Sequence, residues 1–329
     1  AVLASVALVA LGLVLAKRGA DPRRLASWIA LAAVLPLPWI ASDPLDAAPA
    51  SGLSGTPPVL AAERKPEGRV FVTLHDPSLL GDWIASSGAA WRPDVATRAH
   101  AALAGYANLM CGVATATSPS PIGNPRVTRL LGAALQGGNP AAILALADVG
   151  AIVTPFPARF PGARLDRRLD GVSRYELPGR VGRVFFARSV EVADDDAAFA
   201  ALRRPDFDPE ARAYVADASA PLPHVSGPGY SVARVEADAP EELRVLIATG
   251  KPRFLVVTRS FDPGWHATLD GSPVAPVRTD LAFFGLAIPA GQHRLVLRYR
   301  PASYRVGTWI SGISCLVFVS FWLAGGPRR

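Results

Sequence analysis

The sequence is poor in cysteine, since its 329 residues include only Cys111 and Cys315. No CxxC pair exists, and Cys315 falls in an apolar segment, so the sequence predicts neither a disulfide framework nor a cysteine zinc site. The motifs GxSxG, HExxH and GxGxxG are also absent, as is a phosphate-binding loop, and the five histidines are scattered. The sequence therefore lacks the common signatures of hydrolases and nucleotide-binding proteins, and it predicts no metal site in this chain.

Charged residues are scarce as well, at 19% of the chain, although the formal net charge is +7. Six basic residues next to apolar segments, opposed only by Asp21, account for +5 and leave +2 for residues 25–327. A nucleic-acid-binding protein concentrates its basic residues on a folded face, so this distribution excludes nucleic acid as a partner. The six residues are Lys17, Arg18, Arg23, Arg24, Arg328 and Arg329.

Three long runs carry no charge: residues 1–16, 25–41 and 306–326. Their lengths suit helices that cross a lipid bilayer, the first of them truncated. A signal peptide is the alternative for the first run, but it requires a basic residue before the apolar stretch, whereas Lys17 and Arg18 follow it. The sequence begins inside this run at Ala1, so we expect it to be a fragment or a processed product.

The basic residues also predict the orientation of these spans. The loop 17–24 (KRGADPRR) and the tail 327–329 (PRR) are basic, and basic loops stay in the cytoplasm. We therefore expect a multi-pass protein of a bacterial cytoplasmic membrane with residues 42–305 outside the cytoplasm. Its parts are two helices with a basic loop (1–41), a linker rich in Pro, Ala, Gly and Ser (42–66), an α/β region (67–227), a β-sandwich (228–305) and a C-terminal helix (306–326).

The α/β region contains strand candidates at 69–74 and 150–154 and a capped helix that begins at Asn139. Its sequence DDDAAFAALRR starts with Asp194 and Asp196, a D-x-D pair that in some proteins holds a divalent metal against a sugar diphosphate. The favoured interpretation is a helix N-terminus, because acidic residues at the start and arginines at the end complement the helix dipole.

From residue 229 on, seven short strand candidates follow one another with turn residues between them. This pattern predicts an antiparallel sandwich. In RLVLRYR, Leu295, Leu297 and Tyr299 alternate with arginines, as in a half-buried strand. The predicted fold is a membrane-anchored α+β protein in which transmembrane helices flank an extracytoplasmic region, an α/β layer followed by an antiparallel β-sandwich.

The stretch FDPGWHATLDGSPV (261–274) gathers polar and aromatic groups inside this sandwich. Asp270 and Gly271 predict a two-residue hairpin turn, and Asp262 is expected to hydrogen-bond its own turn. Trp265 is either a core residue, which we favour, or an exposed platform for a sugar. His266 is expected on the strand surface. The favoured interpretation of the whole stretch is therefore a β-hairpin.

The segment 255–312 resembles the C-terminal region of the YfhO family of bacterial membrane proteins. The resemblance rests on Pro263-Gly264-Trp265, Asp270-Gly271, Gly285, residues 289–293 (PAGQH) and residues 299–301 (YRP). Segments 106–131, 147–156 and 203–215 look like further family segments, so the resemblance covers most of residues 95–325.

The resemblance implies a membrane glycosyltransferase of the GT-C class, which transfers sugar from a polyprenyl-phosphate donor to a cell-envelope glycopolymer such as a teichoic acid. The catalytic carboxylate of that class lies in the first extracytoplasmic loop, so no catalytic residue is assigned here and the chain alone is expected to be inactive. No cofactor is evident, and a divalent cation would belong to the core upstream. Expected partners are the lipid bilayer, the donor and the glycan acceptor.

The candidate acceptor-binding residues are Asp262, Trp265, His266, Asp270 and Asp280, with turn formation and packing as the competing explanation. A non-catalytic, membrane-tethered sandwich that binds glycan or a partner protein is the alternative function. A transporter subunit would require charged or helix-breaking residues inside the spans, and apart from Pro36 and Pro38 the sequence shows none.

Overall fold

The computed structural model of the chain describes residues 57, 59–60, 68–75, 77–86, 99–104, 113–117, 124–136, 139–156, 160–169, 171–216 and 229–324. The chain divides into two compact units, Ala48–Arg300 and the combination of Ala1–Ala47 with Pro301–Arg329. The predicted membrane spans 1–16 and 25–41 lie outside the described residues, as does most of the predicted linker 42–66. Within that linker, Val59 and Leu60 are buried in a hydrophobic cluster.

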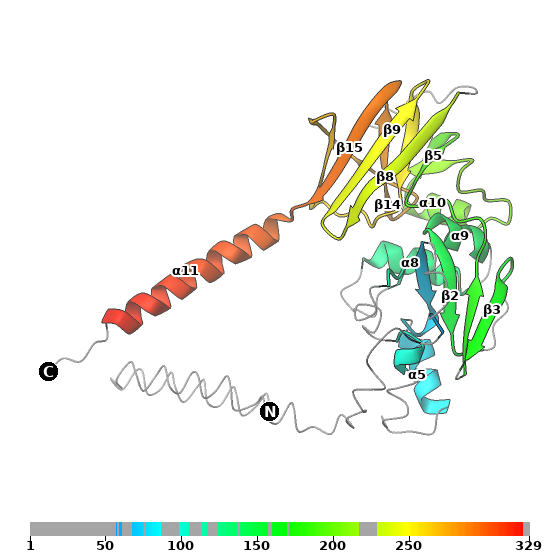
Figure 1. The fold of residues 1–329 in the computed structure, drawn as a ribbon, viewed down its shortest axis with the longest axis horizontal. Helices are drawn as coiled ribbons and strands as arrows, with labels where there is room; N and C mark the ends of the chain where they lie inside the picture. Colours follow the sequence, from blue (N-terminus) through cyan, green and yellow to red (C-terminus); the bar gives the residue numbers. More distant parts are fainter. Residues whose placement is uncertain are drawn as a thin grey trace. The chain divides into compact units, whose positions relative to one another are not determined.

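Four strands of the larger unit form sheet A (Figure 1). In spatial order they are β1 (Arg69–Val72), β2 (Val149–Thr154), β4 (Val172–Glu176) and β3 (Arg164–Leu169). β1 and β2 are parallel, and the other neighbours are antiparallel. The predicted strands at 69–74 and 150–154 are thus observed, although β1 ends at Val72 and continues as the 3-10 turn η1 (Thr73–His75).

Helices α8 (Pro125–Ala133) and α9 (Pro140–Leu146) begin with the same local signal, and α5 (Pro77–Ser86) follows η1. Asn124 Oδ1 accepts a hydrogen bond from the Arg126 N–H at 3.0 Å, and Asn139 Oδ1 accepts one from the Ala142 N–H at 3.2 Å. A proline then occupies the first turn, where no backbone donor is needed. The cap predicted at Asn139 is confirmed.

Two further sheets contain the remaining strands. Sheet B has the order β5 (Val184–Ala187), β10 (Arg253–Val257), β14 (Phe283–Ile288), β13 (Val277–Thr279), β7 (Ala213–Val215) and β6 (Val190–Val192). Sheet C has the order β12 (Ser272–Val274), β11 (Trp265–Leu269), β15 (Gly291–Tyr299), β9 (Glu242–Thr249) and β8 (Ser231–Ala239). In Figure 1, β8, β9 and β15 lie side by side in one twisted sheet.

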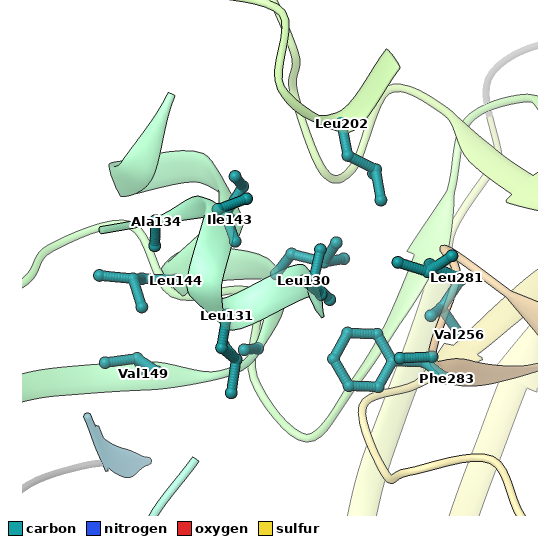
Figure 2. Packing of buried hydrophobic residues seen from close by; sticks show 14 of the residues in the cluster. Leu130, Leu131, Ala134, Ile143, Leu144, Val149, Leu202, Val256, Leu281 and Phe283 are labelled. Atoms are coloured by element: carbon teal, nitrogen blue, oxygen red, sulfur yellow. The ribbon is translucent and has the colours of Figure 1, made fainter. Parts of the chain in front are cut away.

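Sheets B and C pack face to face, so the predicted antiparallel sandwich is observed in part: β6 and β7 of sheet B are parallel and precede residue 228. Their shared core takes Leu243 and Val245 from β9, Leu255 and Val257 from β10, and further residues from β14 and β15. The other face of sheet B, with Phe254 and Val256, packs on a second core that includes α8, α9 and α10 (Figure 2). All five residues of β10 are buried, because this strand lies between two cores, and this explains its uninterrupted apolar sequence.

Sheet B takes strands from both sides of the predicted boundary at 227/228. β5, β6 and β7 precede it, whereas β10, β13 and β14 follow it. The predicted strand at 272–279 (SPVAPVRT) is divided, since β12 joins sheet C and β13 joins sheet B. Pro276 lies between them and has no N–H to continue a ladder, which favours the change of sheet.

The D-x-D sequence forms a helix cap, as favoured from the sequence. Helix α10 (Asp195–Leu202) starts after Asp194, whose carboxylate accepts hydrogen bonds from the N–H groups of Asp196 and Ala197 at 3.0 and 2.8 Å. Asp195 and Asp196 occupy the first turn and Arg203 is the C-cap, so charges of both signs match the helix dipole. The Asp194 carboxylate is therefore occupied by hydrogen bonds from the backbone of α10.

The predicted C-terminal span coincides with helix α11 (Ala302–Ala324) in the smaller unit. Several large apolar side chains on it are exposed, among them Trp309 and Leu316. Nevertheless, none of the helices that the structure describes combines the length and apolar composition needed to traverse a bilayer. The mixed α+β fold is confirmed, and the flanking membrane helices stay predictions.

Candidate functional site

A groove on the larger unit lies where the FDPGW segment meets the start of α8. It has a volume of about 670 Å³. Its floor and walls come from the N-terminus of α8, the segment 260–263, the first residue of β11 and the last residue of β15. The lining residues are Asn124, Pro125, Arg126, Pro240, Ser260, Phe261, Asp262, Pro263, Trp265, Arg278 and Tyr299. We call this feature the tryptophan groove.

Trp265 packs at the edge of the core, as favoured from the sequence, and is also partly exposed. Its ring lies 6.1 Å from the Phe284 ring and 5.2 Å from the Tyr299 ring, measured between centroids, at the edge of the sandwich core. The residue stays partly exposed and lines the groove. Its ring partners come from β14 and β15, which explains why no partner is visible nearby in the sequence.

Asp262 forms the predicted turn and also reaches the groove. Its Oδ1 accepts a hydrogen bond from the Gly264 N–H at 2.7 Å, and its carbonyl accepts one from the Trp265 N–H at 3.1 Å. The turn therefore sets the start of β11. Burial raises the pKa of Tyr299, and the charge of Asp262 and a hydrogen bond to it act in the same direction. Tyr299 thus presents a neutral hydroxyl to the groove at neutral pH.

The α8 side of the groove is joined to the FDPGW segment by side-chain contacts. Asn124 Nδ2 donates hydrogen bonds to Ser260 Oγ at 3.0 Å and to the Phe261 carbonyl at 3.1 Å. Arg126 and Arg278 both bind Asp195, the first residue of α10. Burial raises the pKa of Asp195, but hydrogen bonds from Arg278 and Arg126 outweigh it and hold the pKa below its usual value.

The other three candidates predicted from the sequence lie away from the groove. His266 is exposed on β11 and does not line it. Asp270 forms the β11–β12 hairpin turn at φ 51°, where its carboxylate accepts from the Arg294 N–H and contacts His293 Nδ1, each at 2.7 Å. The hairpin predicted at Asp270-Gly271 is confirmed by the Leu269–Ser272 pair that closes it.

Asp280 is enclosed in the protein interior, with 0% of its surface exposed. Its Oδ1 accepts from the Tyr214 N–H at 2.8 Å, and its own N–H donates to the Tyr214 carbonyl at 2.7 Å. Burial raises the pKa of Asp280 to about 7, although the Tyr214 N–H acts against this. The carboxyl group therefore joins β7 to the β13–β14 turn, and no ligand reaches it from the groove.

A second pocket adjoins the tryptophan groove and contains residues that the sequence did not suggest. It is lined by Arg69, Arg183, Asp238, Pro240, Arg259, Ser260 and Trp265 and has a volume of about 270 Å³. We call it the arginine pocket. The guanidinium carbon of Arg259 lies 5.0 Å from the Trp265 ring centroid, and Trp265 lines both hollows.

No group of three or more His, Cys, Asp or Glu side chains is positioned to hold a metal ion in the part of the chain that the structure describes. The residues that line the tryptophan groove offer aromatic surface, an amide, two hydroxyl groups, one carboxylate and two arginines. This combination suits recognition of a polar ligand with apolar faces.

A family model described as "Bacterial membrane protein YfhO" matches residues 236–311. The match contains the FDPGW segment and Tyr299, and it confirms the resemblance in this region. The further family segments suggested upstream lie outside the match and stay predictions. No match was found among curated proteins or among solved structures.

Proposed function

We propose that this chain, whose residues 236–311 match the family model described as bacterial membrane protein YfhO, is the C-terminal part of a membrane glycosyltransferase. The enzyme would transfer sugar from a polyprenyl-phosphate donor to a cell-envelope glycan. In this proposal residues 42–305 face away from the cytoplasm, and the tryptophan groove holds the acceptor. The catalytic core lies in the part of the protein that precedes residue 1.

The observation that carries the proposal is the position of Trp265 at the wall of the groove. The apolar faces of a sugar ring pack well on an aromatic ring, while its hydroxyl groups need hydrogen-bonding partners at the edge. Tyr299, Asp262 and Asn124 supply such partners around the same groove. The FDPGW segment and Tyr299 lie within the matched region, so the groove is largely a feature of that region.

The chemistry assigns this domain a positioning role. Sugar transfer breaks the bond between the anomeric carbon and the phosphate oxygen of the donor and forms a bond to an acceptor hydroxyl oxygen, whose proton passes to a base. An acceptor held near the membrane meets the donor at high effective concentration, which lowers the entropic part of the barrier. The base and the group that stabilises the leaving phosphate belong to the upstream core.

The proposal is tested in cells with the full-length protein. Trp265→Ala should reduce the sugar content of the envelope polymer about tenfold or more and cause polyprenyl-linked sugar to accumulate, because the acceptor is no longer held. His266→Ala is the matched control on the same strand, and it should leave both quantities unchanged. Normal polymer glycosylation by a stably folded Trp265→Ala protein would contradict the proposal.

The second candidate function is a membrane-tethered module without transfer activity. The observation that favours it is that sheets B and C enclose a hydrophobic core of their own, as a binding module requires. Deletion of the whole gene distinguishes the two functions. Accumulation of polyprenyl-linked sugar supports transfer, whereas an unchanged pool of this lipid supports the module.

A further inference from the structure

The arginine pocket combines three cationic side chains that are distant in sequence. Arg69 is the first residue of β1, Arg183 directly precedes β5, and Arg259 follows β10. Sheet A therefore contributes one arginine, and sheet B contributes the segments that carry the other two. The Arg69 N–H donates to the Asp148 carbonyl at 2.7 Å, and this bond fixes the start of β1 beside β2.

Positive charge exceeds negative charge in this pocket. Arg183 and Arg259 both bind the carboxylate of Asp238. Asp148, behind the pocket, is paired with Arg180 at 3.0 Å and lies 3.7 Å from Arg183. Three arginines and one aspartate line the hollow itself, which leaves a surplus of two positive charges at its surface.

Arg69 is the source of this imbalance. Its guanidinium donates hydrogen bonds to the Ala147 carbonyl at 2.8 Å and to Thr258 Oγ1 at 3.5 Å. Among the described residues, these two neutral groups are its only hydrogen-bond acceptors. Burial lowers the pKa of Arg69 to about 9, with a further lowering by Arg183, while Asp148 and Asp238 act in the opposite direction. The guanidinium therefore stays charged at neutral pH and partly buried, and the two carboxylates that act on it, Asp148 and Asp238, are already paired with other arginines.

We propose that the arginine pocket binds a phosphate group. Guanidinium groups are the preferred partners of phosphate in proteins, because their planar set of N–H donors forms paired hydrogen bonds with phosphate oxygens. Here three of them line one hollow and offer more N–H donors than a single planar carboxylate can accept. A phosphate dianion would neutralise the surplus of two positive charges.

The position beside Trp265 indicates where this phosphate comes from. Trp265, Ser260 and Pro240 line both hollows, so a ligand with a sugar on one side of the tryptophan and a phosphate on the other would occupy both. This inference rests on the proposed function and adds a second binding site to it: the arginine pocket would hold a phosphate group of an acceptor whose sugar lies in the tryptophan groove. An anionic lipid headgroup offers the same chemistry from a different source.

The competing explanation is purely structural, with the arginines serving only to join three segments of the chain. It predicts that substitutions in the pocket lower stability but that phosphate has no effect on the protein. The two explanations are distinguished by binding measurements on the full chain in nanodiscs with neutral lipid.

The experiment titrates this protein with inorganic phosphate, with glycerol 1-phosphate and with a neutral oligosaccharide, and it measures heats of binding and thermal unfolding. Both phosphates should bind and raise the unfolding temperature. Arg69→Gln should weaken phosphate binding about tenfold or more, and Arg69→Lys, which keeps the charge, should weaken it less. Arg164→Gln is the matched control, because it removes an exposed arginine on β3 that is paired with Glu176.

The result that overturns the inference is equal phosphate binding by Arg69→Gln and the unaltered protein, or no binding to either. If Arg69→Gln does not fold, the same comparison is made with Arg69→Lys and Arg183→Gln. Binding of the neutral oligosaccharide without phosphate binding rejects the phosphate site and supports the proposed function. Phosphate binding without oligosaccharide binding supports the phosphate site and rejects the proposed role of the tryptophan groove in acceptor binding. Binding to phosphatidylglycerol vesicles but not to glycerol 1-phosphate would show that the pocket binds a lipid headgroup. It would contradict the inference that the phosphate belongs to the glycan acceptor.

Discussion

The guanidinium carbon of Arg259 lies 5.0 Å from the centroid of the Trp265 ring, and the same guanidinium binds the carboxylate of Asp238. The cation therefore contacts the indole, and β14 and β15 contact it through Phe284 and Tyr299. Burial alone would raise the pKa of Asp238, but Arg259 and Arg183 hold it below its usual value, so the ion pair persists at neutral pH. Trp265 is thus fixed before any ligand arrives.

Replacing Arg259 should loosen this arrangement. Arg259→Gln removes the cation above the ring and leaves Asp238 with Arg183, and we expect the free energy of unfolding to fall by about 1–2 kcal/mol. Urea denaturation followed by circular dichroism measures this change. Arg188→Gln, which removes an exposed arginine paired with Asp208, is the control and should change stability by less than about 0.5 kcal/mol. An equal effect of the two variants would contradict the role assigned to Arg259.

Gly285 is required for the packing of β14 against β10. A Cβ atom at this position would lie 2.2 Å from Phe254 Cζ and 2.2 Å from Thr279 Oγ1. Gly285→Ala should therefore lower the free energy of unfolding by about 2–3 kcal/mol, since a buried strand cannot move freely to relieve the clash. Thermal and urea unfolding provide the measurement.

Gly132 is the matched control for this substitution. A Cβ atom there meets nothing within 4 Å, and the residue lies inside α8. Gly132→Ala should raise stability by about 0.5–1 kcal/mol through helix propensity. If Gly285→Ala is as stable as the unaltered protein, or if Phe254→Leu does not partly rescue it, the packing described for β14 is wrong.

Asp280 should make stability depend on pH in an unusual direction. Its pKa is raised to about 7 in the folded chain and is about 3.9 when unfolded, so the folded state retains a proton that the unfolded state releases. This stabilising contribution is complete below pH 4 and is lost as the pH rises toward 7. Asp280→Asn keeps a neutral acceptor and tolerates the positive φ of 48°.

The measurement compares the two proteins by urea unfolding at pH 5 and at pH 8. Between these values the stability of Asp280→Asn relative to the unaltered protein should rise by about 3 kcal/mol. Asp195 and Asp238 have lowered pKa values and make stability rise with pH, but they do so equally in both proteins. Their contribution therefore cancels when the stability of one protein is subtracted from that of the other. A difference that does not change with pH would show that Asp280 is ionised in the folded chain.

Substitutions at the two asparagine caps distinguish an effect on stability from an effect on ligand binding. Asn124→Ala and Asn139→Ala each remove a helix cap and should each lower the free energy of unfolding by about 1–2 kcal/mol. Asn124 lines the tryptophan groove, whereas Asn139 contacts the carbonyls of Pro205 and Phe207. Only Asn124→Ala should weaken glycan binding, measured by calorimetry, and equal weakening by both would argue that the groove plays no part.

Local sequence signals predicted much of the sandwich. The Asp270-Gly271 turn, the alternation in β15 and the caps at Asn139 and Asp194 depend on residues a few positions apart, and all are observed. The insertion of β5, β6 and β7 into sheet B was not predicted, because strand pairing across a long segment leaves no local pattern. The doubly buried sequence of β10 is the one local hint that a further layer covers sheet B.

The site was predicted only in part for the same reason. Asp262 and Trp265 share one turn and therefore lie together, whereas Asp270 and Asp280, although close in sequence, lie at a hairpin tip and in the interior. The arginine pocket needs residues from β1 and from the segments that flank β5 and β10. Their convergence depends on the packing of sheet A with sheet B, which no spacing in the sequence reveals.

Contact between Trp265 and the glycan is measured most directly by fluorine NMR. The full-length protein is labelled with 5-fluorotryptophan, and the Trp265 resonance is identified by its absence in Trp265→Phe. On titration with oligosaccharides released from the host envelope polymer, the Trp265 resonance should shift, while that of Trp83, buried in a separate cluster, should not. A Trp265 resonance that stays in place at saturating oligosaccharide would contradict glycan binding in the tryptophan groove.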